Sequence, residues 1–172
     1  EPVRSAVTDD PQVLVDALLA RIKALADDQR YEAAAVVRGR LVALLRAAVR
    51  MQRLISLTRI PELVAACPAT NGGWELVLVR YGRLAGAGVC PPGANPRMTV
   101  DIIRATAETV PPGHGPVPNA SAAESERILS WLEQPDTRLV ETATGWALPA
   151  RGATRFLGLL TKAEAAASSD RL

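Results

Sequence analysis

The sequence predicts an α+β fold: an antiparallel helical hairpin followed by a small mixed α/β domain with a β-hairpin and about three helices. In the first sixty residues apolar side chains recur every three or four positions, which is the period of helices that bury one side. Beyond Asn71 the period changes to two around Tyr81-Gly82, as in a pair of strands joined by a tight turn. Aromatic residues are only 3% of a chain that is 48% apolar, so we expect a core of small aliphatic side chains.

The helical hairpin is predicted over residues 11–60. Asp10 and Pro11 are typical of a helix start, because aspartate caps free N–H groups and proline suits the first helical turn. After a short polar break, we expect Asp28 to cap a second helix that runs to about Leu57. So few connecting residues require the two helices to lie antiparallel.

The mixed α/β domain is predicted over residues 62–167. Ser121 and Glu124 fit a capping box, in which a hydroxyl and a carboxylate satisfy backbone N–H groups at a helix start. Thr99 is expected to cap the preceding helix. The expected elements are, in order, strands at 74–78 and 84–89, a helix at 99–110, a helix from 121, strands at 138–142 and 146–148, and a helix at 153–167.

Few residues are candidates for catalysis or metal binding. The single histidine, His114, lies in a proline- and glycine-rich loop and is expected to be solvated. Cys67 and Cys90 match neither a zinc site nor a disulfide framework, so we expect ordinary reduced thiols. Asp101 and Glu108 are typical of solvated helix charges. We therefore expect no catalytic residue, no metal ligand and no cofactor in this chain.

The charge of the chain is distributed unevenly. The formal net charge is +2, yet residues 33–61 carry six arginines and no acidic residue. Because Arg46, Arg50 and Arg53 are separated by four and three residues, they project from one side of a helix, with Arg38 about two turns earlier on nearly the same face. Such a stripe can neutralise several phosphates, which predicts DNA binding. The alternative is an arginine-rich solvated face produced by GC-rich coding. The six arginines are Arg38, Arg40, Arg46, Arg50, Arg53 and Arg59.

Residues 31–41, with the sequence YEAAAVVRGRL, resemble the UVR motif of the repair proteins UvrB and UvrC, whose pattern is roughly F-E-x-A-A-x-L-R-D-x-I. Gly39 replaces the usual aspartate and costs up to about 1 kcal/mol of helix stability. The resemblance implies that the motif contacts UvrB or a second copy of the chain; the alternative is an ordinary alanine-rich hairpin. The partner-binding residues expected from it are Tyr31, Glu32, Ala34, Ala35, Arg38 and Leu41.

The resemblance continues beyond the motif, because residues 77–86 (VLVRYGRLAG) are similar to the hairpin that follows the UVR motif in UvrC. The overall layout resembles the C-terminal part of bacterial proteins that fuse a DEDDh (DnaQ-like) exonuclease to a GIY-YIG (Cho-like) endonuclease. This implies a non-catalytic accessory domain of a nuclease of the nucleotide excision repair type. Its partners would be DNA, UvrB or a second copy, and the parent's own nuclease domains. Their active sites would lie upstream of Glu1.

The sequence leaves two other interpretations of the chain open. One is a purely structural tail that packs on upstream nuclease domains, and the other is an enzyme whose site has no recognisable pattern. The chain begins without methionine, so we expect either a processed protein or a fragment of a longer one. No apolar run approaches the roughly 20 residues needed to span a bilayer, and no basic-then-apolar leader begins the chain. We expect no membrane partner and a cytoplasmic location.

Overall fold

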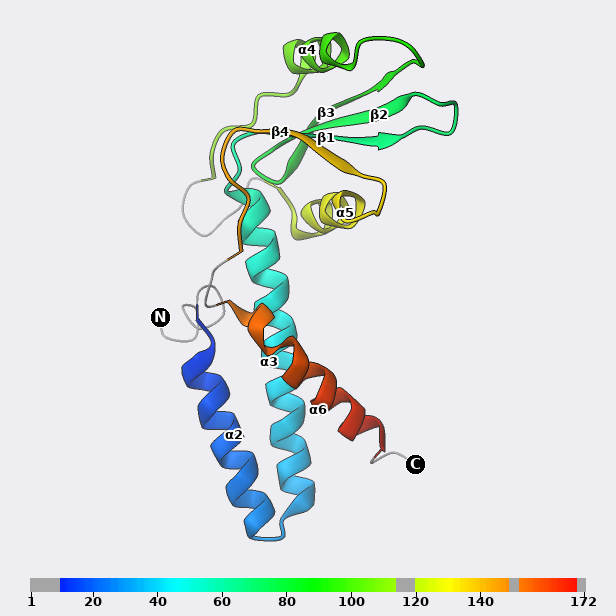
Figure 1. Ribbon diagram of the computed structural model, residues 1–172. Coiled ribbons are helices and arrows are strands. Elements are labelled where there is room, and N and C mark those ends of the chain that lie inside the picture. Colours follow the sequence, from blue (N-terminus) through cyan, green and yellow to red (C-terminus); the bar gives the residue numbers. More distant parts are fainter. Residues whose placement is uncertain (1–9, 114–119, 149–151, 170–172) are drawn as a thin grey trace. The chain divides into compact units, whose positions relative to one another are not determined.

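The computed structural model describes residues 10–113, 120–148 and 152–169 (Figure 1). The chain forms two compact units: a helical unit, made of residues up to Arg53 and from Leu148 onward, and a sheet unit, Leu54–Ala147. The helical unit contains a helical hairpin, and the sheet unit contains a four-stranded antiparallel sheet with helices. The predicted α+β class is confirmed.

The helical unit is built on α2 (Gln12–Asp27) and α3 (Tyr31–Thr58), which lie antiparallel and side by side (Figure 1). A 3-10 turn, η1 (Ala153–Phe156), leads into α6 (Leu157–Ser169). The helices share a small apolar core, as the apolar stripe predicted. Its members are Val15, Leu41 and Leu45, with Leu18, Ile22, Phe156, Leu159 and Leu160 packed around them.

Two polar contacts attach η1 within the helical unit. The side-chain oxygen of Gln52, which is 1% exposed, accepts a hydrogen bond from the Ala153 N–H at 2.7 Å. Arg155 forms an ion pair with Asp10 at 2.7 Å. The hydrogen bond to this buried amide offsets the cost of removing it from water and fixes its position. These contacts hold residues more than a hundred positions apart in one unit.

The ends of the two hairpin helices differ from the prediction in part. The Asp10 carboxylate accepts a hydrogen bond from the Gln12 N–H at 2.9 Å, but the helix begins one residue later than predicted, because Pro11 rather than Asp10 occupies the N-cap position. Asp28 does not cap α3, so that prediction was wrong. Its backbone N–H instead donates to the Ala24 carbonyl and closes α2. Gln29, at φ 60°, then reverses the chain.

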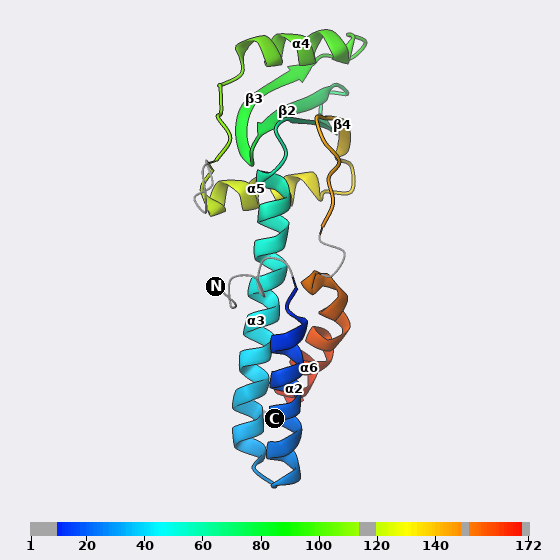
Figure 2. The same ribbon diagram turned by 90° about the vertical axis from the view of Figure 1, so that its left-hand side faces the viewer.

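The sheet unit has the strand order β3-β2-β1-β4, with all neighbours antiparallel. Helix α4 covers one face and α5 the other (Figure 2). Leu54, Leu57 and Ile60 join the apolar cluster on the α5 face. The elements are β1 (Leu63–Pro68), β2 (Trp74–Arg80), β3 (Arg83–Cys90), α4 (Pro96–Thr106), α5 (Ala122–Leu132) and β4 (Arg138–Thr142).

The predicted β-hairpin is confirmed in its turn as well as its strands. Tyr81 and Gly82 have φ values of 49° and 78°, and Arg80 pairs with Arg83 across the turn. Two positive φ angles at the centre of a two-residue turn match the right-handed twist of the strands. A Cβ atom at Gly82 would also meet the Thr58 side chain at 2.7 Å, so only glycine fits this position.

Three predictions about the sheet unit were wrong or incomplete. Residues 146–148 form no strand; instead the Trp146 indole N–H donates to the Ser56 hydroxyl at 3.1 Å and its ring packs in the α5-side cluster. Helix α4 begins at Pro96 rather than near Thr99, because the Asn95 side chain accepts from the Arg97 N–H. Strand β1 was not predicted, since both of its faces are buried and its sequence shows no alternation.

The capping box at α5 is only half formed. The Ser121 hydroxyl oxygen accepts from the Glu124 N–H at 3.1 Å, as predicted. The Glu124 carboxylate accepts a hydrogen bond from the Leu84 N–H on β3 at 3.1 Å. A side chain expected to serve its own helix thus connects α5 to the sheet.

Candidate nucleic-acid and partner interface

The predicted arginine stripe lies on α3 within the helical unit. At about 100° per residue, Arg46, Arg50 and Arg53 fall within an arc of about 60° around the helix, and Arg38 lies about 60° beyond it. Arg46 and Arg50 are exposed, whereas Arg38 and Arg53 are half-buried. The first three residues therefore share one face, and Arg38 lies at its border.

The residues matched to the UVR motif divide into two groups. Ala34 and Leu41 are 2% and 1% exposed, and both lie inside the helical unit. Tyr31 is 66% exposed, and Glu32 and Ala35 are exposed beside it. Ala34 and Leu41 thus support the hairpin from within, while the other three can meet a partner directly.

Gly39 and Arg38 complete the description of the motif. A Cβ atom at Gly39 would meet no atom within 4 Å. The position is exposed, so no close packing requires glycine there. Arg38 is half-buried, so it can contribute to a protein surface and to the border of the arginine stripe.

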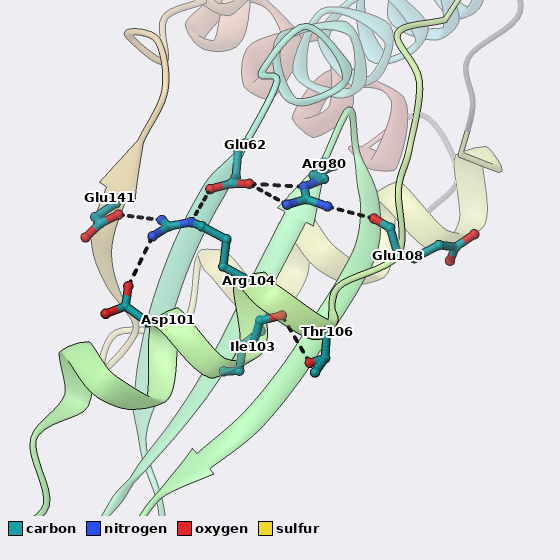
Figure 3. Close-up of polar contacts among 8 residues, drawn as sticks. All are labelled: Glu62, Arg80, Asp101, Ile103, Arg104, Thr106, Glu108 and Glu141. Carbon is teal, nitrogen blue, oxygen red and sulfur yellow. Dashed lines mark hydrogen bonds and ion pairs between the residues drawn. The ribbon is translucent and has the colours of Figure 1, made fainter.

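The sheet unit contains a different kind of charged cluster, centred on Glu62 at the start of β1 (Figure 3). The two oxygens of Glu62 accept hydrogen bonds from Arg80, at 2.9 and 3.0 Å, and from Arg104, at 2.8 Å. Arg104 also reaches Glu141 at 2.6 Å and Asp101 at 3.6 Å. The cluster therefore joins β1, β2, β4 and α4 through alternating charges.

The pKa values in this cluster follow from its geometry. Burial by itself would raise the pKa of Glu62, but the hydrogen bonds from Arg104 and Arg80 outweigh it, and the net pKa lies below the ordinary 4.5. Hydrogen bonds from Arg104 to Glu141 and Glu62 raise the pKa of Arg104. Both shifts favour the charged forms of Glu62 and Arg104, which is typical of a structural ion-pair network and unlike a poised general acid or base.

Local sequence patterns do not predict this cluster, because its members are far apart in the chain. The hydrogen bonds of Glu62 to Arg80 and Arg104 join residues 18 and 42 positions apart, and the bond of Arg104 to Glu141 spans 37 positions. No local spacing rule covers such separations. Glu62 directly precedes β1, and Arg80 ends β2. Their proximity can be predicted only if β1 is first recognised as a strand that pairs with β2.

Residues 10–113, 120–148 and 152–169 contain both cysteines and the carboxylates Asp101 and Glu108. No group of three or more His, Cys, Asp or Glu residues is placed there to hold a metal ion. Cys67 and Cys90 are both free thiols, and Cys90 is buried. His114 lies outside the described residues. Asp101 and Glu108, which were expected to be solvated helix charges, form separate ion pairs with Arg104 and Arg83.

Within the described part of the chain, no helix combines the length and the hydropathy that crossing a membrane requires.

The chain is similar to part of a longer protein. It is 38% identical over 142 residues to a Mycobacterium tuberculosis (strain CDC 1551 / Oshkosh) protein named "Putative bifunctional exonuclease/endonuclease protein". The similar segment is 80% of this chain and 22% of the relative, so the chain spans about a fifth of the relative's length. No family model matches the chain, and no solved structure matches it. A relation to a nuclease-named protein, expected from the sequence, is confirmed; the UVR motif stays a prediction.

Proposed function

We propose that this chain is a non-catalytic module of a DNA-repair nuclease, which binds DNA through the arginine stripe and contacts a protein through the exposed part of the UVR-like segment. The observation that carries the DNA-binding part is the common face of Arg46, Arg50 and Arg53 on α3, in a segment of 29 residues without an acid. A mixed-sign surface is usual for an ordinary exposed helix. Guanidinium groups pair with phosphates in a bidentate manner.

The relative supports the nuclease context of this proposal. Its name describes an exonuclease/endonuclease, and it is several times longer than the similar segment. We propose that the catalytic residues of the parent lie outside this chain. Two-metal phosphodiester hydrolysis needs a cluster of carboxylates. The carboxylates gathered around Arg104 instead form ion pairs with it.

A DNA titration tests the stripe directly. The full chain is titrated against labelled duplex and single-stranded DNA at two salt concentrations. The variant Arg46→Gln/Arg50→Gln/Arg53→Gln should flatten the slope of log affinity against log salt by up to about three contacts, at about 0.9 per contact on duplex. The loss should be the same for unrelated sequences, because phosphate contacts carry no base information.

A charge-matched control separates the stripe from net charge. Arg97, Arg127 and Arg138 are arginines of the sheet unit outside the stripe, and replacing them by glutamine removes the same three charges. This control variant should bind DNA with nearly the same affinity as the unsubstituted chain. Equal losses in both triple variants, or none in either, would leave the stripe a solvated face and favour a structural tail that packs on upstream nuclease domains.

The protein contact is tested on the exposed residues of the motif. Tyr31→Ala/Ala35→Glu should weaken self-association in sedimentation, or association with UvrB in calorimetry, because both side chains are exposed. Ala43→Glu, on an exposed position of the same helix, is the matched control and should have no effect. If neither association depends on Tyr31 and Ala35, the protein-contact part of the proposal fails, while the DNA titration remains an independent test.

A further inference from the structure

A hollow of about 370 Å³ lies between α2 and α3, in the half of the hairpin nearer their connection. It belongs to one unit and is formed by side chains of both helices and their connection. Its lining has two kinds of residue, aliphatic side chains and arginines, and contains no acid. The lining residues are Leu18, Arg21, Leu25, Arg30, Ala33, Val36, Val37 and Arg40.

The charged residues of this lining are all positive. Arg21, Arg30 and Arg40 are all exposed, and none has an ion pair with another residue that the structure describes. The acids nearest in sequence, Asp27, Asp28 and Glu32, are exposed but do not line the hollow. An apolar surface bordered by three like charges lacks the opposite charges that an ordinary exposed helix pair would carry.

The arginines of the hollow are distinct from the stripe. On α3, Arg40 lies about 80° from Arg50, the nearest stripe residue in angle, at about 100° per residue. Arg21 belongs to α2 and Arg30 to the connection. Val36, which lines the hollow, is 58% exposed. The hairpin therefore carries two basic surfaces, and only the hollow combines charge with an apolar floor.

We propose that this hollow docks an acidic amphipathic helix of a partner protein. An aliphatic side chain of that helix would contact Leu18, Val36 and Val37, and carboxylates on either side would pair with the arginines. Helices commonly bind by placing apolar anchors at spacings of three and four residues into a groove. A phosphate backbone would leave the apolar floor uncovered, so DNA fits this surface less well. None of the exposed motif residues Tyr31, Glu32 and Ala35 lines the hollow, so this inference goes beyond the proposed protein contact and names the chemistry of a second partner.

The test uses the full chain and a designed peptide. The probe is a helical peptide of about five turns, with leucines at spacings of three and four and glutamates flanking them. Its binding is measured by fluorescence anisotropy beside two control peptides: a scrambled sequence of the same composition, and one with lysine in place of glutamate. Only the designed peptide should bind measurably, because it alone presents both the apolar stripe and complementary charge.

Variants assign the binding to the hollow. Arg21→Gln/Arg30→Gln/Arg40→Gln should weaken peptide binding about tenfold, since exposed charge pairs contribute modestly and three of them act together. Ala33→Phe should weaken it by filling the hollow without changing charge, with circular dichroism confirming that the helices remain. The stripe variant Arg46→Gln/Arg50→Gln/Arg53→Gln is the matched control. It should bind the peptide with the same affinity as the unsubstituted chain.

The outcomes are separable from those of the DNA titration. Equal affinity for designed and scrambled peptides, or an unchanged affinity in the Arg21/Arg30/Arg40 variant, overturns the inference. If that variant loses DNA affinity but keeps peptide affinity, the hollow belongs to the DNA surface, and the docking assignment is wrong. A stripe variant that binds DNA normally counts against DNA binding alone and leaves this inference standing.

Discussion

Arginine has different neighbours in the two units. Residues 62–110 carry four arginines and four acidic residues, and Arg80, Arg83 and Arg104 form ion pairs with acids brought from other elements. Residues 33–53, in the helical unit, carry five arginines and no acid. The net charge of +2 is therefore a sum over differently charged regions of the chain. In the sheet unit arginines pair with acids of other elements, and in the hairpin an apolar seam connects the helices while Arg46 and Arg50 are exposed on α3.

The largest expected effect tests the apolar seam. Leu41 is 1% exposed and lies in the core of the helical unit. Leu41→Ala should lower the free energy of unfolding by about 3 kcal/mol, from lost burial and the cavity left behind. Denaturant unfolding of the full chain measures it. Tyr31→Ala, at an exposed position of the same motif, is the control and should change little; similar losses in both would contradict the division into inner and outer motif residues.

The next effect tests the ionic cluster of the sheet unit. Glu62→Gln should lower the free energy of unfolding by about 2 kcal/mol at pH 7, because Arg80 and Arg104 lose their shared carboxylate. The folded pKa of Glu62 lies below the ordinary 4.5. Its contribution is therefore fully present above pH 4.5 and is lost as the pH falls through the lower, folded value. Parent and variant should converge in urea unfolding at acid pH, and a gap that is independent of pH would argue against this origin.

A smaller effect of opposite sign is expected at the departure from the UVR pattern. Gly39→Ala should raise the free energy of unfolding by about 0.7 kcal/mol, because alanine restricts the unfolded chain and a Cβ there meets no atom within 4 Å. Thermal unfolding by circular dichroism measures the gain. Gly82→Ala is the contrasting substitution, since a positive φ of 78° and the Thr58 side chain oppose a Cβ there. A loss of stability in Gly39→Ala would indicate a packing role for that glycine.

The smallest expected effect concerns two exposed arginines of the hairpin, which should contribute little to the stability of the fold. Arg46→Gln and Arg50→Gln should each change the free energy of unfolding by less than about 0.5 kcal/mol, since both positions are exposed and glutamine is a good helix former. Arg104→Gln, measured beside them, should cost more because three carboxylates surround that guanidinium. Equal losses at all three positions would remove the contrast between the units.

Local patterns predicted the helices and the β-hairpin but not the long-range contacts. Three features depend only on neighbours within a few residues and follow rules of spacing and side-chain chemistry. They are the apolar periodicity of α3, the Tyr81-Gly82 turn and the Ser121 cap. Strand β1 has four consecutive buried residues, so its sequence shows no period of two. The register of β1 with β2 and β4 then brings Glu62 near its partners, which no segment of sequence specifies alone.

The candidate interface divides in the same way. Helical spacing alone is enough to predict that Arg46, Arg50 and Arg53 share one face. The resemblance to the UVR motif could not separate buried Ala34 and Leu41 from exposed Tyr31, because the motif gives positions along one helix. Which of them face inward depends on where α2 and α6 pack. The hollow between α2 and α3 likewise depends on two helices at once.

The hydrogen bond from the Leu84 N–H to Glu124 has a consequence for how copies of this chain behave at high concentration. Strand β3 is an edge of the sheet, and unpaired edges are templates on which further strands can add. The Ala85 carbonyl accepts from the Glu108 N–H at 2.8 Å, beside the occupied Leu84 donor. A carboxylate and a backbone amide of the same chain thus occupy adjacent edge positions. Another molecule extending the sheet there would first have to break both bonds, which protects this end of the strand against edge-to-edge aggregation.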